Sequence, residues 1–205
     1  MHLPTVLIAT TNSGKFREFC ELLGDLPLTL VSLADLPGAP VVPEDGDTYV
    51  ANATAKAVAI ACWSKQVALA DDSGIEVDAL GGAPGVRAAR YAGEQQDSRA
   101  NVAKLLEALA GIPYEKRSAR FRCVIVVARP DGVTLTSEGS CEGRILDAPR
   151  GTSGFGYDPV FLDLQSGLSF AEMPAQMKNR VSHRARAAKA LATRLVDFAR
   201  GLAPR

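Results

Sequence analysis

The chain has 205 residues, of which 47% are hydrophobic and 22% are charged, so it is long enough to bury a substantial core. Its 23 basic and 23 acidic residues give a formal net charge of zero, which argues against a protein that binds nucleic acid without sequence preference. No stretch comes near the roughly 18 consecutive apolar residues of a membrane span, and the N-terminus lacks the basic start and apolar core of a signal peptide, so we expect a cytoplasmic protein with no membrane partner.

The first half of the chain alternates short apolar runs with segments of helical spacing. TVLIAT is typical of a buried strand, whereas Phe16, Phe19, Cys20 and Leu23 recur at helical intervals and Gly24 can end that helix. The predicted elements are, in order, a strand over 5–10, a helix from Asn12 or Ser13 to Gly24, a strand over 28–33, a helix capped by Asp47 and running to about Ser64, and strands over 67–71 and 75–80.

The second half of the chain predicts a helix, a long hairpin and a final helix. Asp97 can cap the first helix and Gly111 can end it, and the hairpin turns at Asp131 and Gly132. The final helix is expected from near Ser182 to about residue 201. This order predicts an α/β fold, with a mixed central sheet, flanking helices and two lobes around a substrate cleft. No linker-like stretch divides the chain, so we expect a single domain over residues 1–205.

The four cysteines show no CxxC spacing, and all of them lie inside predicted elements. We therefore expect buried, reduced thiols rather than disulfides or a metal site. They are Cys20, Cys62, Cys123 and Cys141.

Adjacent carboxylates, Asp71 and Asp72, follow an apolar run in the stretch LADDSGIEVDALGGAPGVRAARYAG. Successive side chains of a strand point to opposite sides, so at most one of the two is expected to face a substrate. A separate acidic loop, PEDGD, contains Glu44. Mg²⁺ prefers oxygen ligands and keeps several waters, so one carboxylate from each segment suits it. Asp45 and Asp47 are better explained as turn and helix-cap residues.

The segment TTNSGK, residues 10–15, joins the first strand to the first helix and places Lys15 in the first helical turn. Unpaired N–H groups and the helix dipole favour an anion at such a position. An ordinary capped helix with a solvated lysine is the alternative. The segment is not a Walker A loop, because that motif needs glycine at Ala9 and serine or threonine at Phe16.

Two later segments, GFGYDP at 154–159 and KNRVSHR at 178–184, offer aromatic rings and hydrogen-bond donors. The first suits stacking on a planar ring, and the second gathers Lys178, His183 and Arg184 near a helix start. A packed turn and a solvated basic face are the respective alternatives.

Together these segments resemble the inosine triphosphate pyrophosphatase family over nearly the whole chain. The resemblance rests on TTNSGK, the long DDSG stretch, GFGYDP and SHR, in that order. It implies a homodimer that uses Mg²⁺ and cleaves ITP, dITP and XTP between the α and β phosphates, releasing a monophosphate and pyrophosphate. The partners that it implies are purine nucleoside triphosphates, and nucleic acid is not among them.

The resemblance also implies a role for each matching residue. Asp72 is expected to accept a proton and to bind the metal together with Glu44. Expected substrate-binding residues are Thr10, Thr11, Asn12, Ser13, Gly14, Lys15, Ser73, Phe155, Gly156, Tyr157, Asp158, Lys178, His183 and Arg184.

One position departs from the family pattern. The helix after the acidic loop usually opens with Glu-Asn-Ala, but here Ala51 precedes Asn52 and Ala53. A metal scheme with three or more acidic ligands is therefore in doubt. Two alternatives are a Maf-type nucleotide pyrophosphatase, which has a related fold and chemistry, and a nucleotide sensor that does not cleave its ligand.

Overall fold

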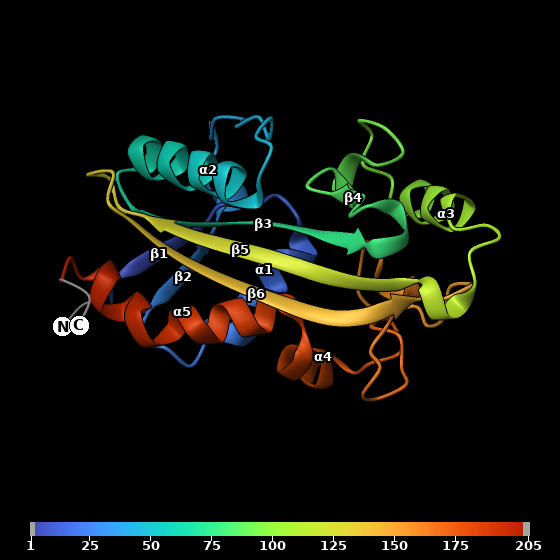
Figure 1. Cartoon of the computed structure of the whole chain (residues 1–205). Coiled ribbons are helices and arrows are strands. Elements are labelled where there is room, and N and C mark those ends of the chain that lie inside the picture. The colour runs from blue at the N-terminus through green and yellow to red at the C-terminus, as the bar shows by residue number, and fades with distance from the viewer. Residues whose placement is uncertain (1–2, 203–205) are drawn as a thin grey trace. The chain divides into compact units, whose positions relative to one another are not determined.

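The computed structural model describes residues 3–202, which form strands and helices in alternation (Figure 1). The strands are β1 (Thr5–Ile8), β2 (Thr29–Ser32), β3 (Val67–Val77), β4 (Pro84–Gly85), β5 (Ser118–Ala128), β6 (Thr134–Ile145) and β7 (Phe161–Leu162). The helices are α1 (Ser13–Leu23), α2 (Tyr49–Ser64), α3 (Ser98–Ala108), α4 (Ala175–Val181) and α5 (His183–Ala199). Short 3₁₀ helices lie at Leu33–Asp35, Asp78–Leu80, Ala88–Arg90, Tyr114–Lys116 and Asp158–Val160.

The strands form one mixed sheet in the order β2-β1-β3-β5-β6-β7, with β4 paired to β3. β1 runs parallel to both β2 and β3, whereas β4 and β7 are antiparallel to their partners. The predicted α/β class with a mixed sheet and flanking helices is therefore confirmed. None of the helices in the described residues is long and apolar enough to cross a membrane.

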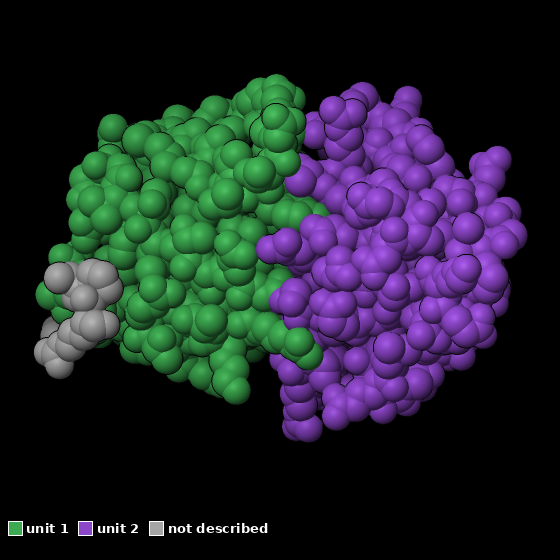
Figure 2. Space-filling view, viewed as in Figure 1, with its two compact units in different colours: residues 1–72, 123–139, 184–205 green, residues 73–122, 140–183 purple. Residues whose placement is uncertain are grey.

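The chain divides into two compact units, which Figure 2 colours separately. Unit 1 comprises residues 1–72, 123–139 and 184–205, and unit 2 comprises residues 73–122 and 140–183. Each unit has its own cluster of buried hydrophobic side chains. The long strands β3, β5 and β6 each contribute residues to both units.

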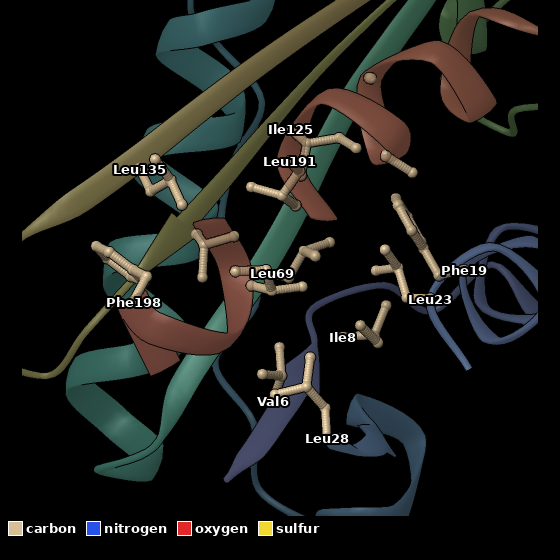
Figure 3. Close-up of a cluster of buried hydrophobic side chains, with 14 of the residues drawn as sticks. Val6, Ile8, Phe19, Leu23, Leu28, Leu69, Ile125, Leu135, Leu191 and Phe198 are labelled. Carbon is tan, nitrogen blue, oxygen red and sulfur yellow. The ribbon is translucent and has the colours of Figure 1, made fainter. Parts of the chain in front are cut away.

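In unit 1, the strands bury both of their faces. Val6, Ile8 and Leu69 belong to a cluster with Phe19 of α1 and Leu191 of α5 (Figure 3). Side chains of a strand alternate between faces. The intervening residues are also buried, and Figure 1 shows α2 on the opposite side of these strands from α5. A residue in the middle strand, β3, therefore has a helix to contact on either side.

The largest difference from the sequence prediction concerns β3. The strand was expected to end at residue 71 and a second to begin at 75, but one strand runs without interruption from Val67 to Val77. Asp-Asp-Ser-Gly is a poor strand sequence by propensity, yet tertiary contacts commonly override β propensity. Here both carboxylates are buried and have partners, as described below.

Three smaller predictions also need correction or refinement. Asn12 caps α1 as predicted, but Thr48 rather than Asp47 caps α2, through a hydrogen bond from the Ala51 N–H to its hydroxyl. The predicted final helix is confirmed as α5, but a short helix that was not predicted, α4, precedes it and is separated from it by the extended Ser182. All four cysteines are free, but only Cys123 and Cys141 are buried, whereas Cys20 is half-buried and Cys62 is exposed.

Candidate functional site

The two adjacent carboxylates of β3 point in opposite directions, as the alternation of a strand predicts. Asp71 contacts the Lys15 Nζ at 3.0 Å and accepts a hydrogen bond from Arg184 Nη2 at 2.8 Å. Asp72 instead accepts a hydrogen bond from Asn52 Nδ2 of α2 at 2.9 Å. The helices on opposite sides of β3 thus give the neighbouring carboxylates separate environments.

Asp71 lies in a buried cluster of charges that includes two cations. The Arg184 side chain is only 1% exposed, and its other terminal nitrogen, Nη1, donates to Glu18 Oε2 at 2.5 Å. Burial alone would raise the pKa of Asp71, but the charges of Lys15 and Arg184 hold that pKa well below its usual range. Asp71 therefore stays ionised at neutral pH and is the weaker base of the two carboxylates.

Asp72 is buried and accepts its hydrogen bond from a neutral amide, that of Asn52, and its acid–base properties differ accordingly. Burial raises the pKa of Asp72 above its usual value, and the hydrogen bond from Asn52 and the charge of Lys15 offset only part of that rise. The negative charges of Glu44 and Asp71 raise it further. Of the two, Asp72 is the carboxylate with the higher proton affinity, which suits a general base.

The acidic loop is held to α2 by two side chains, and sequence reasoning assigned a role to neither. Lys56 forms an ion pair with Glu44, and the Gly46 N–H donates to Asn52 Oδ1 at 2.8 Å. Asn52 and Lys56 are four residues apart in α2, and this helical spacing was the available signal for a shared face. The sequence did not show that the acidic loop packs against this face of α2, so the spacing alone could not assign a role to either residue.

Glu44 and Asp72 offer oxygen atoms of the kind that Mg²⁺ binds. Glu44 acts electrostatically on Asp72, so the two carboxylates lie in the same neighbourhood. No group of three or more His, Cys, Asp or Glu side chains gathers as a metal site anywhere in residues 3–202. These donors fit a magnesium ion that keeps several waters, and they do not make a closed cage of protein ligands.

The predicted phosphate-binding segment forms a capped helix start. Asn12 Oδ1 accepts the hydrogen bond of the Lys15 N–H at 3.0 Å, and Thr10 Oγ1 accepts that of the Asn12 N–H at 3.2 Å. Thr11, Asn12 and Ser13 are exposed, so the start of α1 is open to solvent. The N–H groups of a first helical turn have no helical acceptors and attract an anion.

In unit 2, the structure brings together three of the predicted base-binding residues, Phe155, Asp158 and Lys178. The Lys178 Nζ donates to Asp158 Oδ2 at 2.6 Å and lies 4.8 Å from the centre of the Phe155 ring. The same Asp158 oxygen accepts from the Phe155 N–H at 2.8 Å. This contact orders the GFGYDP turn around Asp158.

The other predicted residues of unit 2 have different surroundings. His183 stacks on Phe121 with ring centroids 4.5 Å apart. Tyr157 is buried, and its hydroxyl donates to the Ala88 carbonyl at 2.7 Å, so it anchors the turn rather than offering a free ring. Ser73 lies in β3 and is half-buried. Arg184, although adjacent to His183 in sequence, belongs to the Asp71 cluster of unit 1.

Comparison with known proteins identifies close relatives. The family model described as the Ham1 family matches residues 6–194. A dITP/XTP pyrophosphatase of Desulforamulus reducens is 51% identical over 90% of this chain and 92% of that protein. Another, of Xanthomonas campestris pv. campestris, is 54% identical over 88% of this chain and 91% of that protein. The solved structure of a HAM1 protein from Coxiella burnetii is 39% identical and matches with a TM-score of 0.85, covering 94% of this chain and 98% of that one.

Proposed function

The chain belongs to the Ham1 family, and on that premise we propose that it hydrolyses dITP, ITP and XTP to the nucleoside monophosphate and pyrophosphate. The names of its relatives support the reaction and the substrate class. The proposal rests mainly on the different charge environments of the two neighbouring carboxylates, Asp71 and Asp72. Asp71 is neutralised by Lys15 and Arg184, while Asp72 keeps a raised pKa beside Glu44.

The triphosphate binds to residues 10–15 in this proposal. The exposed start of α1 supplies N–H groups and the positive end of the helix dipole. Lys15 adds a full charge, and Asp71 holds its ammonium group by the 3.0 Å contact. Negative charge that accumulates on the departing pyrophosphate is stabilised by donors that are already oriented.

Asp72 accepts the proton of the attacking water. Its burial in a rigid strand fixes the carboxylate, and its raised pKa favours proton transfer to it. Glu44 and Asp72 would hold Mg²⁺, with Asn52 next to them. When bound, the ion neutralises phosphate charge and polarises water.

The purine base is recognised by residues of unit 2 in this proposal. Phe155 offers a ring for stacking, and the Asp158–Lys178 pair supplies a buried acceptor and donor. His183 adds a hydrogen-bonding group beside Phe121. Hypoxanthine and xanthine carry an acceptor oxygen at position 6, where adenine carries a donor, so donors in the site discriminate against adenine. The terminal nitrogens of Arg184 contact Asp71 and Glu18, which favours a positioning role for that residue.

The remaining proposals concern the cofactor, the cellular location and the oligomeric state. We propose Mg²⁺ as the physiological cofactor, a cytoplasmic location and a homodimer, all of them implied by the family resemblance. The free cysteines are compatible with a reducing compartment. Sedimentation analysis of the purified chain tests the homodimer.

A pyrophosphate-release assay with dITP, ITP, XTP, GTP, ATP and dTTP, with and without Mg²⁺, tests the function. We expect cleavage of the first three, very poor cleavage of ATP and no activity after removal of divalent metal. Preferential cleavage of dTTP would favour the Maf-type alternative. Tight binding of XTP without release of pyrophosphate would favour a sensor.

The absence of the usual glutamate at position 51 gives a further prediction. Ala51 is exposed in the first turn of α2, one residue before Asn52. If Glu44 and Asp72 suffice for the metal, Ala51→Glu changes the Mg²⁺ concentration for half-maximal activity by less than about threefold, since one exposed carboxylate contributes little. Metal titration of both proteins at saturating dITP measures this. A large shift to lower Mg²⁺ would mean that the natural chain lacks a ligand.

A further inference from the structure

Asn52 connects the acidic loop to β3 within unit 1. Its side chain is buried, with a residue exposure of 2%, and it uses both ends of its amide. Oδ1 accepts from the Gly46 N–H at 2.8 Å, and Nδ2 donates to Asp72 Oδ2 at 2.9 Å. An asparagine side chain carries an acceptor and a donor at once, so it can join a backbone N–H to a carboxylate.

The approach of the acidic loop to Asn52 also depends on the residue at position 46. A Cβ atom added to Gly46 would lie 2.7 Å from Asn52 Oδ1 and 3.0 Å from the Ala51 Cβ. The first distance is shorter than a normal contact, so a larger residue would force the amide to move. Glycine at position 46 therefore lets the loop N–H reach Asn52 without displacing its amide.

The geometry of this bridge matters because Glu44 lies two residues before Gly46 in the same loop. Glu44 and Asp72 are both negatively charged and repel each other. Other groups must therefore hold the two carboxylates in position. Lys56 fixes the end of the Glu44 side chain, and Asn52 links the loop backbone to Asp72.

From these contacts we infer that Asn52 is a positioning residue, which fixes the acidic loop and the Asp72 carboxylate relative to each other through the Gly46 N–H. The inference rests on the proposed function, in which Glu44 and Asp72 act together. Asn52 touches neither substrate nor water in this role. It acts by holding two groups that do.

The test uses the full-length chain with Asn52→Ala, Gly46→Ala and the double variant. Loss of an outer partner of metal-binding carboxylates typically costs about 10- to 100-fold in activity, so kcat for dITP should fall in that range in each single variant, with a smaller change in KM. Both substitutions disrupt the hydrogen bond from the Gly46 N–H, and Asn52→Ala also removes the hydrogen bond to Asp72. The double variant should therefore be no slower than Asn52→Ala alone. Amide hydrogen exchange of Gly46, measured by NMR without nucleotide, should accelerate in Asn52→Ala.

Asn101 provides a matched control in unit 2. It is also buried, accepts from the Ala92 N–H at 2.6 Å and donates to the Ala89 carbonyl at 2.8 Å. Asn101→Ala should therefore destabilise the fold as Asn52→Ala does, while leaving kcat nearly unchanged.

Three results would overturn the inference: equal kcat in Asn52→Ala and Asn101→Ala, multiplied losses in the double variant, or unchanged exchange of the Gly46 amide. The exchange measurement also separates this inference from the proposed function. If the unmodified chain released no pyrophosphate from dITP, ITP or XTP, the function would fail, whereas Gly46 exchange would still report whether Asn52 holds the loop.

Discussion

Replacing Asp72 with asparagine is expected to lower kcat for dITP by roughly 10²–10⁴-fold, the usual contribution of a general base. Asparagine has nearly the same shape and keeps an oxygen that can accept the hydrogen bond from Asn52. It cannot accept a proton from water at neutral pH. Pyrophosphate release at saturating substrate measures the loss, and thermal unfolding should show that the variant still folds.

Asp71→Asn is the matched control for this substitution. Asp71 faces Lys15 and Arg184, so removing its charge takes one carboxylate partner from the buried guanidinium, which still contacts Glu18. We expect this variant to lose stability, with a smaller effect on kcat once the folded fraction is taken into account. Equal kcat losses at the two positions, with equal stability, would contradict the assignment of separate roles.

The fold class could be predicted because local patterns and tertiary contacts agree over most of the chain. Asn12 caps α1, Asp97 caps α3, and the turn at Asp131 and Gly132 joins β5 to β6, all as expected. Each of these features depends on residues a few positions apart. Sequence alone contains that information.

The continuity of β3 could not be predicted in the same way. Asp71 and Asp72 interrupt an apolar run, and a strand end is the local explanation for such an interruption. The strand continues because Arg184, more than a hundred positions away in the sequence, neutralises one carboxylate, and Asn52 hydrogen-bonds the other. Such partners become visible only when the helices are packed on the sheet.

The same limit applies to the candidate site. The family resemblance supplied the roles of Asp72 and Lys15, but no local signal indicated that Asn52 and Lys56 hold the acidic loop. The composition of SHR suggested donors aimed at a purine base. In the structure, the last residue of that motif contributes its charge to the buried cluster around Asp71.

Replacing Arg184 with alanine is expected to lower the free energy of unfolding strongly. Removing one partner of a buried ion pair typically costs about 3–5 kcal/mol, because an uncompensated charge stays behind. Arg184 and Asp71 side chains are each only 1% exposed, so solvent cannot replace the guanidinium. Lys15 stays beside Asp71, at 3.0 Å, and limits the loss to the lower end of this range. Denaturant unfolding of both proteins measures the difference in the free energy of unfolding.

Adding Asp71→Asn to Arg184→Ala distinguishes a missing charge partner from a simple cavity. The double variant no longer buries at position 71 a carboxylate that has lost its guanidinium partner, so it should be more stable than Arg184→Ala alone. A cavity left by the guanidinium would persist in both variants, and the second substitution would then recover nothing.

Substrate selectivity decides between the two roles considered for Arg184. If the residue read the base directly, Arg184→Ala would remove a charge-assisted hydrogen bond of about 1.5–3 kcal/mol from ITP alone, or roughly 10- to 150-fold in kcat/KM. Cleavage of ATP would hardly change. The contacts to Asp71 and Glu18 instead favour a role in placing α5 and Lys15, on which every triphosphate depends. We therefore expect kcat/KM for ITP and ATP to fall by the same factor, and a selective loss for ITP would return Arg184 to the base-binding site.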